Sequence, residues 1–119
     1  MLYVLRHARA RSHSDGGDHE RELKRSGRHD ARVAGEFLAR LDGSPDRIVS
    51  SSAARALETA QLARSTGGFE PAVEPQPRLY GASGRELVAA LSELDAGTRV
   101  LLVGHEPSLS ELIGLLTGA

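Results

Sequence analysis

Short apolar runs alternate along the chain with stretches of helical periodicity. Three runs have the length and composition of buried strands, at residues 2–5, 47–50 and 98–103. Apolar residues at helical spacing lie between and after these runs and predict amphipathic helices. Strands that alternate with helices are typical of a parallel sheet covered on both faces. The pattern therefore predicts an α/β fold, a three-layer αβα sandwich with a mainly parallel central sheet.

We expect four helices, each with its own boundary signals. The first ends before the Gly-Ser-Pro turn at 43–45, and the second covers about 53–63 and stops at the glycine pair 67–68. Ser83 and Glu86 form a capping box that opens the third. Pro107 suits the first position of the fourth. The positions assigned to apolar faces are Val33, Ala34, Phe37, Leu38 and Leu41 in the first helix and Leu109, Leu112, Ile113 and Leu116 in the fourth.

Two segments lack a regular pattern. Residues 9–25 are polar and contain Gly16-Gly17, which predicts a loop. Residues 69–80 contain three prolines, so they can form only a short strand or an extended loop.

Composition narrows the functional classes. A length of 119 residues suits one domain, and a net charge of −1 gives no overall attraction to nucleic acid or membranes. The absence of cysteine excludes disulfides, thiol catalysis and thiolate metal sites. The opening residues do not resemble a signal peptide, and no apolar run approaches the roughly 18 residues of a membrane span. We therefore expect a cytoplasmic protein without nucleic-acid or membrane partners.

Polar residues follow three of the predicted strands at their carboxyl ends. Arg6 and His7 follow the first, Arg55 lies shortly after the second, and His105 and Glu106 follow the last. Ligands of open parallel sheets bind beyond the carboxyl ends of the strands. We therefore expect these residues to meet at one edge of the sheet.

The residue types suit phosphoryl transfer. A neutral imidazole such as that of His7 is a competent nucleophile, and neighbouring cations keep it neutral by lowering its pKa. Arg6 and Arg55 can fork onto phosphoryl oxygens, and His105 can donate a further hydrogen bond. Glu106 is either the general acid that protonates the leaving group or an acidic residue favourable at a helix start.

Three motifs carry a family resemblance. The segments LRHA at 5–8, SSAARALETA at 51–60 and VGHEPSLSELIG at 103–114 resemble the histidine phosphatase superfamily, in particular its short phosphohistidine phosphatase branch. The resemblance implies a phosphoglycerate mutase-like fold and a phosphohistidine intermediate. It also implies His7 as the nucleophile, Arg6 and Arg55 as phosphate-binding residues, and His105 as the second histidine of the pocket.

The chain departs from the family pattern at three places. Ala8 replaces the usual glycine after the nucleophile, and Ser52 replaces the usual proline before the arginine motif. The sequence ends at Ala119, where the family normally continues through another strand or more. We therefore expect one domain over residues 1–119 that lacks the family's C-terminal strand or strands.

The expected activity is that of a metal-independent phosphatase with a phosphohistidine intermediate. A phosphohistidine displayed on another protein is the preferred substrate, because short loops leave little material for a lid over a small metabolite. Two alternatives stay open: an enzyme acting on small phosphoesters or as a mutase, and a catalytically silent phosphate-binding module. No cofactor is expected, because His13, His19 and His29 lack zinc-ligand spacing and cations beside His7 would repel a metal ion. The oligomeric state is left open.

Overall fold

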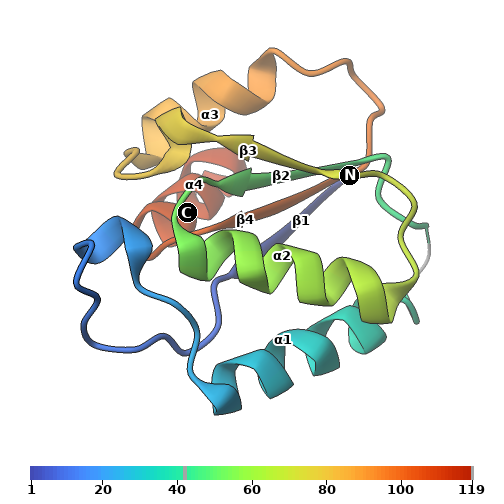
Figure 1. The fold of residues 1–119 in the computed structure, drawn as a ribbon. Helices are drawn as coiled ribbons and strands as arrows, with labels where there is room; N and C mark the ends of the chain where they lie inside the picture. The colour runs from blue at the N-terminus through green and yellow to red at the C-terminus, as the bar shows by residue number, and fades with distance from the viewer. Residues whose placement is uncertain (42, 119) are drawn as a thin grey trace.

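The central element is a parallel sheet with helices packed around it (Figure 1). The computed structural model describes residues 1–41 and 43–118, and within them the sheet has the strand order β1-β4-β2-β3. The strands are β1 (Leu2–Arg6), β2 (Arg47–Ser51), β3 (Val73–Gln76) and β4 (Val100–Gly104). Every pairing is parallel. The predicted α/β class is confirmed.

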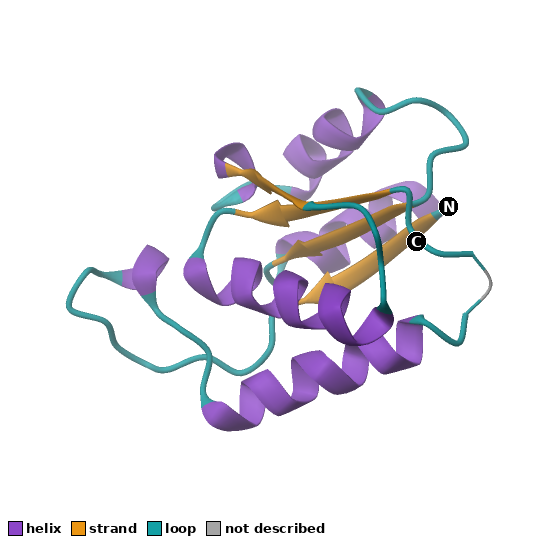
Figure 2. Cartoon of the chain, turned by 45° about the vertical axis from the view of Figure 1, so that its right-hand side comes forward, coloured by secondary structure: helices purple, strands orange, loops and turns teal. Residues whose placement is uncertain are grey.

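Helices cover both faces of this sheet (Figure 2). The helix α2 lies on one face with α1 beside it, and α3 and α4 cover the other. Their bounds are α1 (Arg25–Leu38), α2 (Ala54–Gly67), α3 (Gly84–Ser92) and α4 (Ser108–Thr117), with short 3-10 turns η1 (Asp18–Glu20) and η2 (Pro77–Leu79). None of the described helices is long and apolar enough to cross a membrane.

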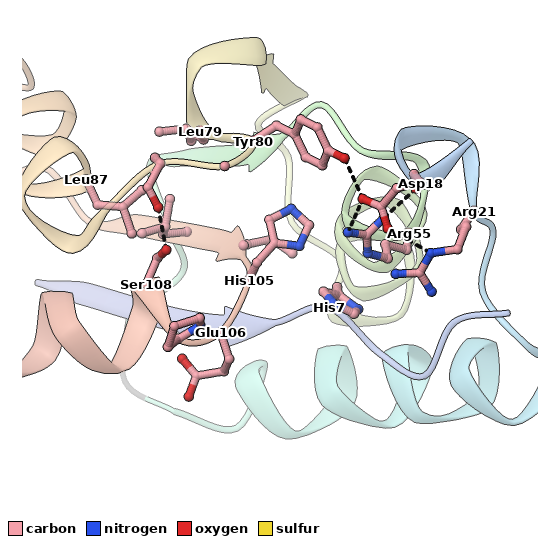
Figure 3. A pocket seen from close by; sticks show the side chains of 16 residues that line it. His7, Asp18, Arg21, Arg55, Leu79, Tyr80, Leu87, His105, Glu106 and Ser108 are labelled. Atoms are coloured by element: carbon pink, nitrogen blue, oxygen red, sulfur yellow. Dashed lines mark hydrogen bonds and ion pairs between the residues drawn. The ribbon is translucent and has the colours of Figure 1, made fainter. Parts of the chain in front are cut away.

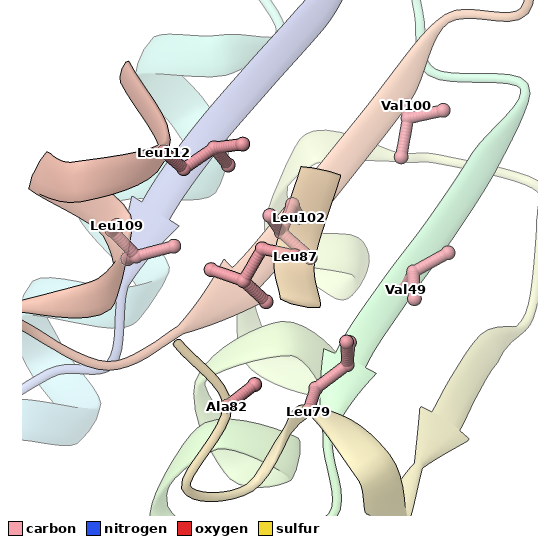
Figure 4. Close-up of a cluster of buried hydrophobic side chains, with 8 residues drawn as sticks. All are labelled: Val49, Leu79, Ala82, Leu87, Val100, Leu102, Leu109 and Leu112. Carbon is pink, nitrogen blue, oxygen red and sulfur yellow. The ribbon is translucent and has the colours of Figure 1, made fainter. Parts of the chain in front are cut away.

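The core divides into two layers because side chains alternate along β4. Val100 and Leu102 contribute to a cluster with residues of α3 and α4, whereas Leu101 and Val103 join one with residues of α2. All four side chains of β4 are almost fully buried, as a strand covered on both sides requires. Figure 4 shows the first cluster, in which Leu87 of α3 and Leu109 of α4 pack over the sheet.

The first helix exists, but its predicted apolar face is only partly covered. Ala34 and Leu38 are half-buried, and Leu38 packs against the core cluster that includes residues of α2. Val33 and Phe37 are 47% and 59% exposed, and Leu41 lies beyond the helix end. The buried residues of α1 are Gly27, Ala31 and Gly35, and the helix packs mainly on α2. A Cβ on Gly35 would lie 2.3 Å from the Ala63 carbonyl oxygen of α2. The close contact between α1 and α2 therefore buries the small residues of α1, and much of the predicted apolar stripe stays exposed.

The other predicted elements agree with the structure apart from small shifts. The Ser83–Glu86 capping box is present, and Gly68 ends α2 in the left-handed conformation with φ of 67°. Pro107 precedes α4 as its N-cap instead of occupying its first position. In α4 only part of the apolar face is covered, since Ile113 and Leu116 are 47% and 55% exposed.

Candidate active site

A cavity of about 570 Å³ opens at the carboxyl ends of β1 and β4 (Figure 3). His7, Arg55 and His105 all line it, as the sequence predicts. The register explains the convergence, because Arg6 is level with Gly104 and Ser50 with Val103. Residues nearly a hundred positions apart are thereby brought to one edge of the sheet.

His7 is positioned by its neighbour in the chain. Its Nδ1 lies 2.8 Å from the Ala8 carbonyl oxygen, and since a carbonyl only accepts, Nδ1 carries the proton. In the neutral ring the lone pair therefore resides on Nε2. Partial burial lowers the pKa of His7, and the positive charges of Arg55, Arg6 and Arg21 lower it further, against the Ala8 hydrogen bond, which raises it. A neutral imidazole with a free lone pair is what a nucleophile needs.

His105 is the second histidine of the cavity, and its ring centroid lies 5.1 Å from that of His7. Its Nε2 is 2.8 Å from the Ser51 hydroxyl, which also accepts a hydrogen bond from Ala53 N–H. A hydroxyl that accepts from the backbone can donate to Nε2, and in that tautomer the ring proton of His105 lies on Nδ1. Burial and the charge of Arg55 lower the pKa of His105 to about 4. His105 is thus a neutral hydrogen-bond donor at neutral pH.

Arg55 is almost fully buried at the start of α2 and is held by the loop after β1. It donates from one terminal nitrogen to the Asp18 carbonyl oxygen at 2.8 Å and from the other to the Asp18 carboxylate at 3.1 Å. Its buried Nε finds no hydrogen-bond partner among the described residues. Buried charged donors are costly when unpaired. Each terminal nitrogen of Arg55 keeps a second N–H beside its bond to Asp18, and Arg55 lines the cavity, so these groups can donate to an anion such as a phosphoryl group.

The Asp18 carboxylate accepts hydrogen bonds from three side chains, an arrangement that the sequence did not predict. Besides Arg55, its carboxylate accepts hydrogen bonds from Tyr80 and from Arg21 at 3.0 Å. These bonds, that of Tyr80 first, hold the pKa of Asp18 well below its usual range, and the carboxylate raises the pKa of Tyr80. Figure 3 shows Asp18, Arg21 and Tyr80 grouped beside Arg55. The carboxylate fixes the orientation of two arginines at the cavity wall.

Arg6 departs from the expected arrangement. It is exposed at the end of β1 and does not line the main cavity. It lines an adjacent hollow that it shares with His7. Its charge still acts on His7 by lowering its pKa. The structure therefore brings His7, Arg55 and His105 together and leaves Arg6 at their rim.

Glu106 lines the cavity, but its carboxylate is engaged elsewhere. Ser110 donates to it from both its backbone N–H, at 2.8 Å, and its hydroxyl group. These bonds lower the pKa of Glu106, and Figure 3 shows the carboxylate turned away from His105. Of the two roles left open, this geometry favours capping of α4 over proton donation.

The histidines outside the cavity serve other contacts. His19 Nε2 lies 2.8 Å from the Ser52 hydroxyl, and its ring packs edge-on against Tyr80. His13 and His29 are exposed. Within residues 1–41 and 43–118, no three His, Asp or Glu side chains gather as a metal site would require.

Thr59 of α2 ties two parts of the site together. Its buried hydroxyl accepts a hydrogen bond from Ala8 N–H at 3.0 Å and donates one to the Arg55 carbonyl oxygen at 2.7 Å. Ala8, whose carbonyl orients His7, is thereby fixed through its N–H to the helix that carries Arg55. In the sequence, the only sign of this link is that Thr59 lies four residues after Arg55, one helical turn further on.

Comparisons with known proteins agree with this geometry. The family model of the histidine phosphatase superfamily (branch 1) matches residues 2–82. An uncharacterised protein of Mycobacterium tuberculosis is 34% identical over 110 residues, which cover 91% of this chain and 66% of the relative. An uncharacterised chloroplastic protein of Arabidopsis thaliana is 30% identical over 99% of this chain and 59% of its own length. The chain thus spans about two thirds or less of the curated relatives it matches.

Solved structures of similar fold include two with related sequences. The structure of "the putative phosphohistidine phosphatase SixA from Agrobacterium tumefaciens" superposes with a TM-score of 0.89 at 27% identity, over 98% of this chain and 76% of that one. A SixA structure from Nakamurella multipartitia has 32% identity and a TM-score of 0.74, over 90% and 59% of the two chains. With its motifs at one sheet edge and a family match over most of its length, this chain belongs to the histidine phosphatase superfamily, branch 1.

Proposed function

We propose that the protein is a metal-independent phosphatase that forms a phosphohistidine intermediate on His7. The observation that carries the proposal is the geometry of His7. Its Nδ1 donates to the Ala8 carbonyl oxygen, so that Nε2 keeps its lone pair in the cavity that Arg55 and His105 share. Membership of a phosphatase superfamily supports the same chemistry.

The reaction takes two steps. The Nε2 lone pair of His7 attacks phosphorus, a P–N bond forms, and the bond from phosphorus to the leaving group breaks with its electron pair on that group. Water then attacks the phosphorus on His7, the P–N bond breaks, and inorganic phosphate leaves. Arg55 and His105 donate to the phosphoryl oxygens as charge develops; one such donor is typically worth about 3 kcal/mol of barrier.

The preferred substrate is a phosphohistidine carried by another protein. A leaving imidazole needs less help from a general acid than an alkoxide does. Hydrogen bonds lower the pKa of both carboxyl groups at the cavity, Asp18 and Glu106, which makes them poor acids at neutral pH. The two SixA structures of similar fold, each named a "putative phosphohistidine phosphatase", support the same substrate class.

The intermediate can be trapped directly. Brief incubation with a ³²P-labelled phosphodonor such as phosphoramidate should label the protein in an acid-labile, alkali-stable manner. His7→Ala should abolish the label, His105→Ala should slow its turnover, and the exposed His29→Ala should leave it unchanged. Label that persists in His7→Ala would show that another residue is the nucleophile.

Small phosphoesters are the second candidate substrates. A cavity of about 570 Å³ falls in the range that holds small molecules, about 300–1,000 Å³. The ratio of kcat/KM for a phosphohistidine peptide to that for p-nitrophenyl phosphate separates the two. A ratio below one would favour the small esters.

A further inference from the structure

A second hollow, of about 500 Å³, lies beside the main cavity and shares His7 and Arg21 with it. Cationic side chains dominate its lining, and among the described residues that line it only Asp30 carries a carboxylate. We call its four cationic residues the basic rim: Arg6, Arg9, Arg21 and Lys24. The basic rim therefore adjoins His7, the residue that we propose as the nucleophile.

The charges of the basic rim are only partly compensated. Asp30 pairs with Arg9 at 2.8 Å, and Asp18 pairs with Arg21 at 3.0 Å. Among the described residues, neither Arg6 nor Lys24 forms an ion pair with a carboxylate. Both side chains are exposed. Two unpaired positive charges thus flank His7 on this side.

A defined backbone supports these cations. Lys24 N–H donates to the Arg9 carbonyl oxygen at 2.9 Å. The first turn of α1 packs directly on that carbonyl, because a Cβ on Gly27 would lie 2.0 Å from it. Arg6 closes β1, the strand that leads into His7. The rim is therefore a fixed feature of the β1–α1 connection.

We propose that the basic rim binds acidic side chains that flank the phosphorylated residue of a protein substrate. The proposal rests on the phosphatase activity proposed above and adds a preference within it. In the proposed reaction Arg55 and His105 serve the phosphoryl group in the main cavity, so the unpaired cations of the adjoining hollow are placed to meet the groups next to it. In a protein substrate these are the neighbouring residues, and carboxylates are the groups that complement arginine and lysine.

The overall charge of the molecule does not attract polyanions. Its net charge is −1, so the attraction is local to the rim and falls off within about 10 Å at 0.1 M salt. A few carboxylates next to a phosphohistidine match this range better than an extended nucleic acid does.

The test uses two synthetic phosphohistidine peptides of equal length. In one, Asp and Glu flank the phosphohistidine; in the other, Asn and Gln replace them. At low ionic strength we expect kcat/KM to favour the acidic peptide by about five- to tenfold, mainly through KM, and expect 0.5 M NaCl to remove most of this preference. Lys24→Glu should abolish or invert it. Arg40→Glu, which makes the same charge change beyond the far end of α1, should preserve it.

The outcomes separate the two proposals. Equal kcat/KM for both peptides, or an acidic preference that survives Lys24→Glu, would overturn the assignment of the rim while the phosphatase activity stands. If the protein hydrolyses none of the three substrates, the two peptides and phosphoramidate, both the proposed activity and the assignment of the rim would be overturned. A single-stranded DNA 20-mer that binds more tightly than the acidic peptide, and loses that affinity in Lys24→Glu, would assign the rim to nucleic acid instead.

Discussion

At the scale of single residues, the site depends on side chains that orient others. Ala8 contributes no functional side chain, yet its carbonyl sets the tautomer of His7 and its N–H is bound by Thr59. The Thr59 hydroxyl also reaches the Arg55 carbonyl oxygen. One buried hydroxyl thus couples the placement of His7, the proposed nucleophile, to that of Arg55, the proposed phosphate-binding arginine. Errors of about 1 Å in such placement cost up to about a hundredfold in rate.

Replacing Thr59 tests this coupling. Thr59→Val keeps the shape but leaves Ala8 N–H without its partner, so we expect kcat to fall about tenfold with little change in KM. The unpaired group should also cost about 1–3 kcal/mol of stability. Thr59→Ser keeps the hydroxyl and should restore kcat, although it loses the methyl packing. Steady-state kinetics and urea unfolding of both variants measure these effects; a stability loss in Thr59→Val with unchanged kcat would show that the role is structural only.

The sequence predicted the site residues that follow strands and missed those that do not. The convergence of His7, Arg55 and His105 was predicted because the carboxyl ends of parallel strands meet in space. Asp18 lies in a polar loop whose path is set by tertiary contacts with Arg55 and Tyr80. No local pattern encodes those contacts. Arg6 was placed correctly at a strand end, but its side chain extends to the rim instead of the main cavity.

At the scale of elements, the contact between α1 and α2 illustrates how packing overrides an apolar stripe. The two helices approach through small residues, with Gly35 against the backbone of Ala63 and the side chain of Thr66. Local signals predicted the capping box of α3 and the glycine stop of α2, because each depends on the chemistry of a few adjacent residues. Which face of α1 is buried depends instead on what lies beside it. Periodicity alone does not contain that information.

Adding one methyl group at Gly35 tests this packing. A Cβ there would lie 2.2 Å from Thr66 Oγ1 and 2.3 Å from the Ala63 carbonyl oxygen, so the helices must separate. Helix propensity favours Gly35→Ala by about 1 kcal/mol, but overpacking costs about 1–3 kcal/mol. Because the contact is with backbone, we expect net destabilisation, measured by urea unfolding. Glu36→Ala, on the exposed side of α1, should change stability by less than about 0.5 kcal/mol; a stabilised Gly35→Ala would contradict the close approach.

At the scale of the whole molecule, the fold holds two histidines in their neutral forms. Both lie at the carboxyl edge of the sheet, where burial and nearby arginines lower the pKa of each ring. Arg55, which contributes to both shifts, is fixed by a loop that reaches it from another part of the chain. The architecture that gathers arginines around the two histidines therefore also affects how stability depends on pH.

The last prediction concerns that dependence. The folded-state pKa of His105 is lowered to about 4, below the value of about 6.5 of an unfolded histidine. The unfolded chain therefore binds more protons between these values. It follows that the stabilising effect of the neutral ring is complete above about pH 6.5 and is lost as pH falls towards 4. The lowered pKa of His7 acts in the same direction.

We expect the free energy of unfolding, measured by urea titration, to decline steadily from pH 7 to pH 4.5. His105→Asn should flatten this decline, whereas the exposed His13→Asn should leave it unchanged. An equally steep decline in His105→Asn would show that the histidine is not held neutral by the fold.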